Sequence, residues 1–163
     1  MKKHYITKLI LFSSIMILAA CQNETDYKMV RKQVLDQHDR IMFDGERAMN
    51  NKMKLDTLGM SGLVALKKQQ PTLDTALERK QMQALSKKLT DANDLMNDWM
   101  HNFKSDVGGK SNEEAVKYFN EENVKVNKLD SIYKAVLKET DTYLKKLNIK
   151  PDTTMKSMNH MKM

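Results

Sequence analysis

SNEEAVKYFNEENVKVNKLDSIYKAVLKETDTYLKKL, residues 111–147, is the stretch that decides the fold. Its core positions follow one another in alternating steps of four and three, which is typical of a helix that buries one face in a coiled-coil-like seam. Ser111-x-x-Glu114 matches a capping box, and Pro151 is expected to end the helix. The spacing therefore predicts a helix over about 112–147 whose buried positions are Ala115, Phe119, Glu122, Val126, Leu129, Tyr133, Val136, Thr140, Tyr143 and Leu147, broadened by Leu137 and Leu144.

Two further amphipathic stretches precede this one. A helix over about 74–104 is predicted to begin with a Thr75-x-x-Glu78 capping box, and a kink near Thr90 is left open. A helix over about 26–57 comes before it, and residues 58–72 read as an irregular connection because they contain Gly59, Gly62 and Pro71. The apolar stripes are Tyr27, Val30, Val34, His38, Ile41, Gly45, Ala48, Met49 and Leu55 in the first helix, and Leu85, Leu89, Ala92, Met96, Trp99 and Phe103 in the second.

Three long helices with one apolar stripe each must bury those stripes against one another. The predicted fold is therefore all-α, an elongated antiparallel three-helix bundle over residues 26–147 with coiled-coil-like packing. A core this thin is expected to leave no room for a sizeable pocket, and core packing is the expected role of the methionines outside the tail. The 5 glycines, 2 prolines and single cysteine of the 163 residues argue against a β-sandwich or a disulfide scaffold.

The first 21 residues indicate where the protein resides. Lys2, Lys3 and Lys8 precede an apolar run from Leu9 to Ala20, which is typical of a secretory signal peptide over residues 1–20. Leu18-Ala19-Ala20-Cys21 resembles the lipobox of bacterial lipoproteins, in which the cysteine is lipidated and becomes the new N-terminus. The prediction is a protein anchored in the bacterial envelope, at the outer membrane, through Cys21 and a tether over residues 21–25. The alternative is a signal peptide followed by a chance or buried cysteine.

The charge balance argues against a nucleic-acid partner. The formal net charge of the whole chain is +7, but past the first twenty residues 25 basic side chains face 21 acidic ones. Lys28, Arg31 and Lys32 share one face of the first helix close to the anchor. They are predicted either to touch anionic lipid headgroups or to form an ordinary solvated face.

Two segments carry a resemblance to a known family. They are His38-Asp39-Arg40-Ile41-Met42 and the stretch from Asp91 to Phe103, DANDLMNDWMHNF. They resemble small helical bacterial lipoproteins that are often labelled "viral A-type inclusion protein", over about residues 26–147 but poorly across 58–72. The resemblance implies a helical fold and an envelope location, and it implies no activity.

No enzymatic motif is present in the sequence, which favours a non-enzymatic structural or interaction module. His38 is expected to be a partly buried polar group, with Asp39 poorly placed to orient it, because neighbouring residues on a helix point about 100° apart. The cluster of Trp99, Met96, Met100 and Phe103 is read either as a core layer at the end of the bundle or as a partner-binding patch. The partner and the oligomeric state stay open.

The C-terminal segment 148–163 suggests an alternative function. Four methionines and one histidine fall within its last nine residues, namely Met155, Met158, His160, Met161 and Met163. Thioethers and imidazole are ligands for Cu(I) or Ag(I). The segment is therefore predicted to be either a disordered tail of incidental composition or a Cu(I)- or Ag(I)-binding tail of an envelope protein.

Overall fold

The computed structural model describes residues 25–153, and this part of the chain is almost entirely helical. The elements are α2 (Tyr27–Thr57), the π-helical turn η1 (Leu58–Gly62), α3 (Leu63–Gln69), α4 (Thr75–Asn102) and α5 (Asn112–Lys146). No strand occurs between residues 25 and 153. The prediction of an all-α fold is confirmed, and the three long helices lie within a few residues of the predicted ranges.

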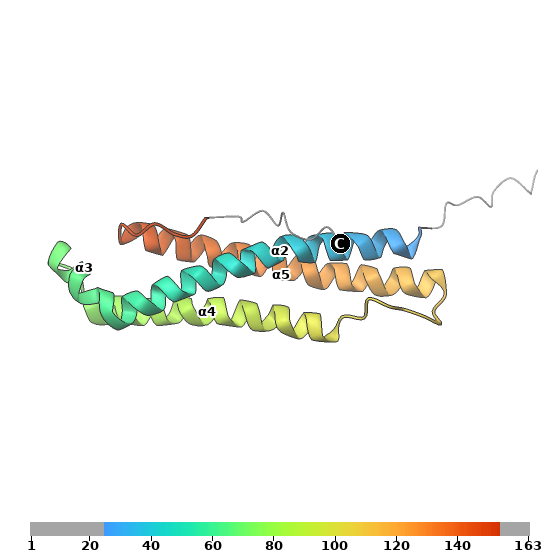
Figure 1. Ribbon diagram of the computed structural model, residues 1–163, viewed down its shortest axis with the longest axis horizontal. Helices are drawn as coiled ribbons and strands as arrows, with labels where there is room; N and C mark the ends of the chain where they lie inside the picture. Colours follow the sequence, from blue (N-terminus) through green and yellow to red (C-terminus); the bar gives the residue numbers. More distant parts are fainter. Residues whose placement is uncertain (1–24, 154–163) are drawn as a thin grey trace, which may run out of the picture.

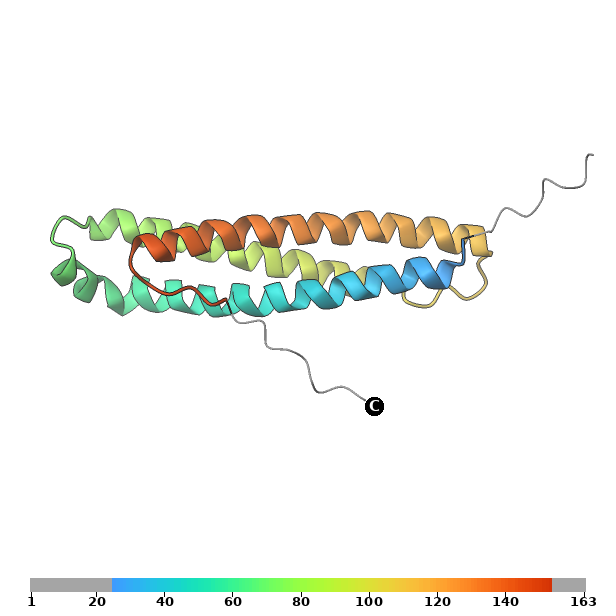
Figure 2. The same ribbon diagram turned by 90° about the horizontal axis from the view of Figure 1, so that it is seen from above.

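The three long helices lie side by side and give the molecule an elongated shape (Figures 1 and 2). Helices α2 and α5 run in the same direction, and α4 runs in the opposite one (Figure 1). Each of the three contacts the other two. The short helix α3 turns away from the axis of α2 at one end of the molecule, where it leads into α4.

The central line of the core comes from α5. All ten positions of the predicted stripe are buried, and so are Leu137 and Leu144. Two polar members of that stripe, Glu122 and Thr140, are buried with the apolar ones, at 5% and 0% exposure. The alternation of four and three residues therefore identified the face of α5 that packs inward, polar positions included.

The other two helices add matching stripes, with some departures from the prediction. Val30, Val34, Ile41, Ala48 and Leu55 of α2 are buried, but Met49 is 46% exposed and Asn51 is fully buried instead. In α4 the predicted positions from Leu85 to Trp99 are buried and Phe103 is partly buried. Helix α4 also continues without a break through residue 90.

One of the two predicted capping boxes is present. At the start of α5 the Ser111 hydroxyl accepts from the Glu114 amide at 3.2 Å, and the Glu114 carboxylate accepts from the Ser111 amide at 2.8 Å. The hydrogen bond that the Ser111 amide donates to the Glu114 carboxylate lowers the pKa of Glu114. The prediction for α4 is wrong, because Asp74 caps the helix by accepting from the amides of Ala76 and Leu77.

The prediction of an irregular connection over 58–72 is also wrong. The chain passes from α2 through η1 into α3, and only residues 70–74 link α3 to α4. The glycines allow close packing here, since a Cβ on Gly62 would lie 2.9 Å from Leu58 Cδ2. The carbonyl of Gly59 accepts a hydrogen bond from the Arg79 guanidinium of α4. Gly59 and Gly62 are thus part of a continuous helical segment, in which Gly62 packs closely against Leu58.

Helix α5 ends before Pro151 is reached, which corrects the predicted stop. Asn148 has a left-handed backbone with φ 58°, its amide donates to the carbonyl of Lys145, and the amide of Ile149 donates to that of Leu144. This pattern is a Schellman motif with asparagine in the position that glycine usually takes. The reversal sends residues 149–153 back along α2 (Figure 2), so this part of the predicted tail belongs to the folded domain.

Candidate functional site

Several predicted site residues lie outside the described range. Cys21 precedes it, and Met155, Met158, His160, Met161 and Met163 follow it, so the lipidation and tail metal-binding predictions stay predictions. The basic residues predicted to contact the membrane surface lie in the first turns of α2. Lys28 and Lys32 are exposed and Arg31 is partly buried, and the Lys32 ammonium pairs with Asp36 at 2.6 Å.

The residues predicted as one tryptophan patch lie in two places. Trp99 is only 8% exposed, and its indole N–H donates to Glu122 Oε2 at 2.8 Å. Its ring stacks on Phe103, with centroids 4.8 Å apart, and Phe103 in turn contacts the rings of Tyr118 and Phe119. Met96 and Met100 instead line a groove between α2 and α4. Tyr27 stacks on Phe119, and His38 contacts Trp99. We call this set of neighbouring rings the aromatic end, which comprises Tyr27, His38, Trp99, Phe103, Tyr118 and Phe119.

His38 belongs to this aromatic end. Its ring lies 5.4 Å from the Trp99 ring, and its Nδ1 lies 3.1 Å from Asp39 Oδ1. The expectation that Asp39 is poorly placed is therefore wrong, because rotation of the two side chains brings them together despite the angle between their positions. Within residues 25–153 the buried Nε2 atom has no hydrogen-bond partner. The His38 side chain therefore packs against the Trp99 ring as part of the aromatic end.

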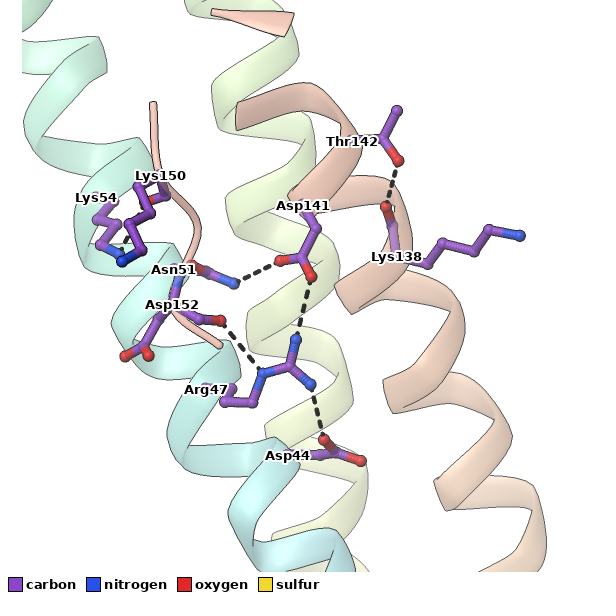
Figure 3. A network of polar contacts seen from close by, with 9 residues as sticks. All are labelled: Asp44, Arg47, Asn51, Lys54, Lys138, Asp141, Thr142, Lys150 and Asp152. Atoms are coloured by element: carbon purple, nitrogen blue, oxygen red, sulfur yellow. Dashed lines mark hydrogen bonds and ion pairs between the residues drawn. The ribbon is translucent and has the colours of Figure 1, made fainter. Parts of the chain in front are cut away.

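A polar network fastens residues 148–153, which we call the C-terminal strap, to α2 and α5 (Figure 3). The Arg47 guanidinium donates to Asp44 Oδ1 at 3.3 Å, to Asp141 Oδ2 at 3.1 Å and to the carbonyl of Asp152 at 3.2 Å. The fully buried Asn51 donates to Asp141 Oδ1 at 3.1 Å and accepts from the Asp152 amide at 2.7 Å. These contacts join α2, α5 and the strap.

Two more hydrogen bonds fix the strap along the outside of α2. Asn50 donates to the Asp152 carboxylate at 2.7 Å, and the Lys54 ammonium donates to the carbonyl of Lys150 at 3.1 Å. Pro151, which belongs to the strap, is buried. The network therefore holds the strap against the part of α2 between Arg47 and Lys54.

Most methionines of the described chain are on the surface, which corrects the expectation that they pack in the core. Only Met82 and Met96 are buried, at 1% and 3% exposure. The other six are between 37% and 82% exposed: Met29, Met42, Met49, Met53, Met60 and Met100. Steps of seven, four and seven residues place Met42, Met49, Met53 and Met60 on one face of α2 and η1, and we call these four the methionine stripe.

Met42 and Met49 of the methionine stripe line a groove between α2 and α4, which we call the methionine groove. Its volume is about 660 Å³, and it is lined mainly by apolar surface. The groove is open to solvent and lies beside the core, and Gly45 is part of its lining. The lining residues are Met42, Phe43, Gly45, Glu46, Met49 and Lys52 from α2, Thr90, Asn93, Asp94, Met96, Asn97 and Met100 from α4, and Tyr133 from α5.

Tyr133 of α5 contributes a hydroxyl group to the lining of the groove. Its hydroxyl donates to Asn93 Oδ1 at 2.6 Å, and a Cβ on Gly45 would lie 3.5 Å from that hydroxyl oxygen. Burial, helped by the charges of Asp44 and Asp94, raises the pKa of Tyr133 to about 12. Tyr133 is therefore a neutral hydrogen-bond donor at physiological pH.

This shifted pKa predicts a loss of stability in alkali. The unfolded phenol titrates near its ordinary pKa of 10.0 and the folded one near 12, so the stabilisation is complete below pH 10 and is lost as the pH rises to 12. Between pH 9 and pH 12 the free energy of unfolding should fall by about 2 kcal/mol more in the wild type than in Tyr133→Phe. Urea unfolding at the two pH values measures this difference, and equal falls in both proteins would contradict it.

Comparison with family models, curated proteins and solved structures gives no match. Between residues 25 and 153 no helix is both long and apolar enough to cross a membrane. Over the same residues no group of three or more His, Cys, Asp and Glu side chains is placed to hold a metal ion. The methionine groove and the strap network are the features of this part of the chain that sequence reasoning missed.

Proposed function

We propose that the protein is a non-enzymatic binding module held on the bacterial envelope by lipid on Cys21. Helix α2 begins at Tyr27, so five residues separate it from the proposed anchor Cys21, and the six steps between Cα atoms span about 20 Å when extended. Lys28 and Arg31 then lie within reach of anionic headgroups, in keeping with the proposed membrane-surface contact. The outer membrane is the proposed location.

We further propose that the helices act as one rigid unit, an elongated antiparallel three-helix bundle with coiled-coil-like packing. The continuous buried stripe of α5 and the buried hydrogen bond between Trp99 and Glu122 support this. A rod of this kind, tethered at one end, presents its long faces to the space next to the membrane. Its function then depends on what those faces bind.

The observation that carries the proposal is the exposure of the methionine stripe beside an open groove. Leucine has a similar volume and specifies a core better than methionine does. Methionines that are exposed, as these are, therefore contribute little to the stability of the fold. Flexible methionine side chains are suited to binding surfaces, because they adapt to what they contact. We therefore assign ligand binding to the methionine groove, in preference to the largely buried Trp99.

A comparison of methionine oxidation in cells and in purified protein tests this function. A brief hypochlorite pulse, followed by peptide mass spectrometry, should oxidise Met42 and Met100 more slowly in cells that naturally make the protein, because a ligand covers the groove. Met60, which is 82% exposed and outside the groove, should react equally in both samples. The buried Met82 should be protected in both. Equal oxidation of Met42 and Met100 in cells and in purified protein would refute a binding role for the groove.

Binding of Cu(I) or Ag(I) by the C-terminal tail is the second candidate function. The strap supports it, because Asp152 is held beside Asn50, which follows Met49 of the methionine stripe on α2. A chain that lacks residues 154–163 but keeps the strap should take up less Cu(I) than the full-length chain. Equal uptake by the truncated and full-length chains would exclude this candidate.

A further inference from the structure

We infer that the methionine groove binds a monovalent soft cation, Cu(I) or Ag(I), through the thioethers of Met42, Met96 and Met100. The inference rests on the proposed function, since it names the ligand of the same groove. It places the metal in the folded rod, on residues other than those of the C-terminal tail. Cu(I) and Ag(I) share the ligand preference argued here, so either ion serves as the probe.

The register of α2 and α4 brings Met42 and Met96 to one level. Gly45 lies opposite Asn93, whose Oδ1 would be 3.8 Å from a Cβ on Gly45. The two helices run in opposite directions (Figure 1), and each residue advances both by the same rise of about 1.5 Å. Met42, three residues before Gly45, therefore faces Met96, three residues after Asn93.

The third sulfur comes from the next turn of α4. Met100 follows Met96 by four residues, so both lie on the same face of the helix. The ring contact between His38 and Trp99 confirms the register at that end, because His38 lies one turn before Met42 on α2. All three methionines line the same groove, and Met49 lies about two turns away at its other end.

The donor set matches a soft cation. Thioethers are soft ligands that favour Cu(I) over hard ions such as Mg²⁺ or Ca²⁺. Met96 is 3% exposed and forms a fixed floor, whereas Met42 and Met100 are 41% and 37% exposed and leave the entrance open. With three rotatable bonds each, these two side chains can close over an ion from opposite helices.

The charges around the groove also favour a cation. The carboxylates of Glu46 and Asp94 lie on its lining, together with the ammonium of Lys52. Lys52 pairs with Asp56 at 2.6 Å, which offsets its positive charge. The charge along the lining is therefore mainly negative, which raises the local concentration of cations.

The test is an Ag(I) titration followed by NMR of ¹³C-labelled methionine methyl groups. It uses the full-length chain in detergent with the Cys21→Ser substitution, so that no thiol competes. The groove variant is Met42→Leu/Met100→Leu, which keeps side-chain volume and removes two sulfurs. The matched control is Met29→Leu/Met60→Leu, which removes two exposed sulfurs outside the groove. A third protein has leucine in place of Met155, Met158, Met161 and Met163.

In the parent and control proteins, the methyl signals of the groove methionines Met42, Met96 and Met100 should shift together with one equivalent of Ag(I). The tail variant should retain this equivalent, and the groove variant should lose it while its circular dichroism spectrum stays that of a folded helical protein. Persistence of the equivalent in the groove variant, or its loss in the tail variant, would overturn the inference. Protection of the groove methionines in cells without any Ag(I) response would overturn the inference alone and leave the proposed function standing.

Discussion

Replacing Trp99 by alanine should lower the free energy of unfolding by about 3–5 kcal/mol, the usual cost of removing a large buried aromatic side chain. The indole is 8% exposed and contacts the rings of His38 and Phe103. Its loss also leaves the buried Glu122 carboxylate with Lys125 as its remaining hydrogen-bond partner. A domain of this size is usually stable by 5–15 kcal/mol, so a large share of the total would be lost.

Two further variants separate the ring from its N–H group in urea unfolding. Trp99→Phe keeps an aromatic ring but removes the donor to Glu122, and should cost about 1–3 kcal/mol. Leu95→Ala alters a residue of α4 that is 46% exposed, and should change stability by no more than about 0.5 kcal/mol. A Trp99→Ala protein as stable as the Leu95→Ala control would show that the aromatic end does not stabilise the rod.

The second large effect is expected from Arg47→Met. The substitution keeps an unbranched side chain but removes the charge that pairs with Asp44 and Asp141, whose side chains are 17% and 18% exposed. A largely buried charge that has lost its partner lowers the free energy of unfolding by about 3 kcal/mol or more. The bond to the Asp152 carbonyl is lost as well, so the C-terminal strap should detach from α2 more readily.

Hydrogen exchange reports on the strap directly. In the wild type the Asp152 amide donates to the buried Asn51 at 2.7 Å and should exchange slowly, whereas in Arg47→Met it should exchange much faster. Arg40→Met is the matched control, because Arg40 lies on the same helix with an exposed side chain. Unchanged stability and unchanged exchange at Asp152 in Arg47→Met would contradict the proposed role of the network.

The helices could be predicted because their signals are local. The alternating spacing in α5 and the Ser111-x-x-Glu114 box both act within a few residues, and the structure shows both. The Thr75-x-x-Glu78 box failed because Asp74, one residue earlier, is an equally good cap. Glu78 is instead buried, where it accepts hydrogen bonds from Tyr143 at 2.7 Å and Lys146 at 3.1 Å.

The C-terminal strap could not be predicted, because its contacts join residues about a hundred positions apart. Asn51 reads as an ordinary polar residue of a helix, yet it is fully buried between Asp141 and Asp152. Asn148 has the left-handed backbone of the turn, a conformation that glycine more often signals in a sequence. Such features follow from the tertiary arrangement, which sequence spacing does not encode.

The exposure of the methionine stripe could have been predicted from the sequence. Ile41 and Ala48 are buried, and Met42 and Met49 directly follow them, so they point about 100° away from the core face. When methionine is treated like any other apolar residue, Met42 and Met49 are not distinguished from the buried positions next to them. The groove itself required the structure, because it depends on the register between α2 and α4.

The central claim, that the rod is anchored by lipid on its single cysteine, is tested most directly by metabolic labelling with a fatty acid. The wild-type protein should incorporate label and fractionate with membranes. Cys21→Ala should incorporate none, while the matched variant Met29→Leu, altered just beyond the tether, should label like the wild type. Label retained in Cys21→Ala, or an unlabelled wild-type chain found in the cytosol with its signal peptide intact, would contradict the account.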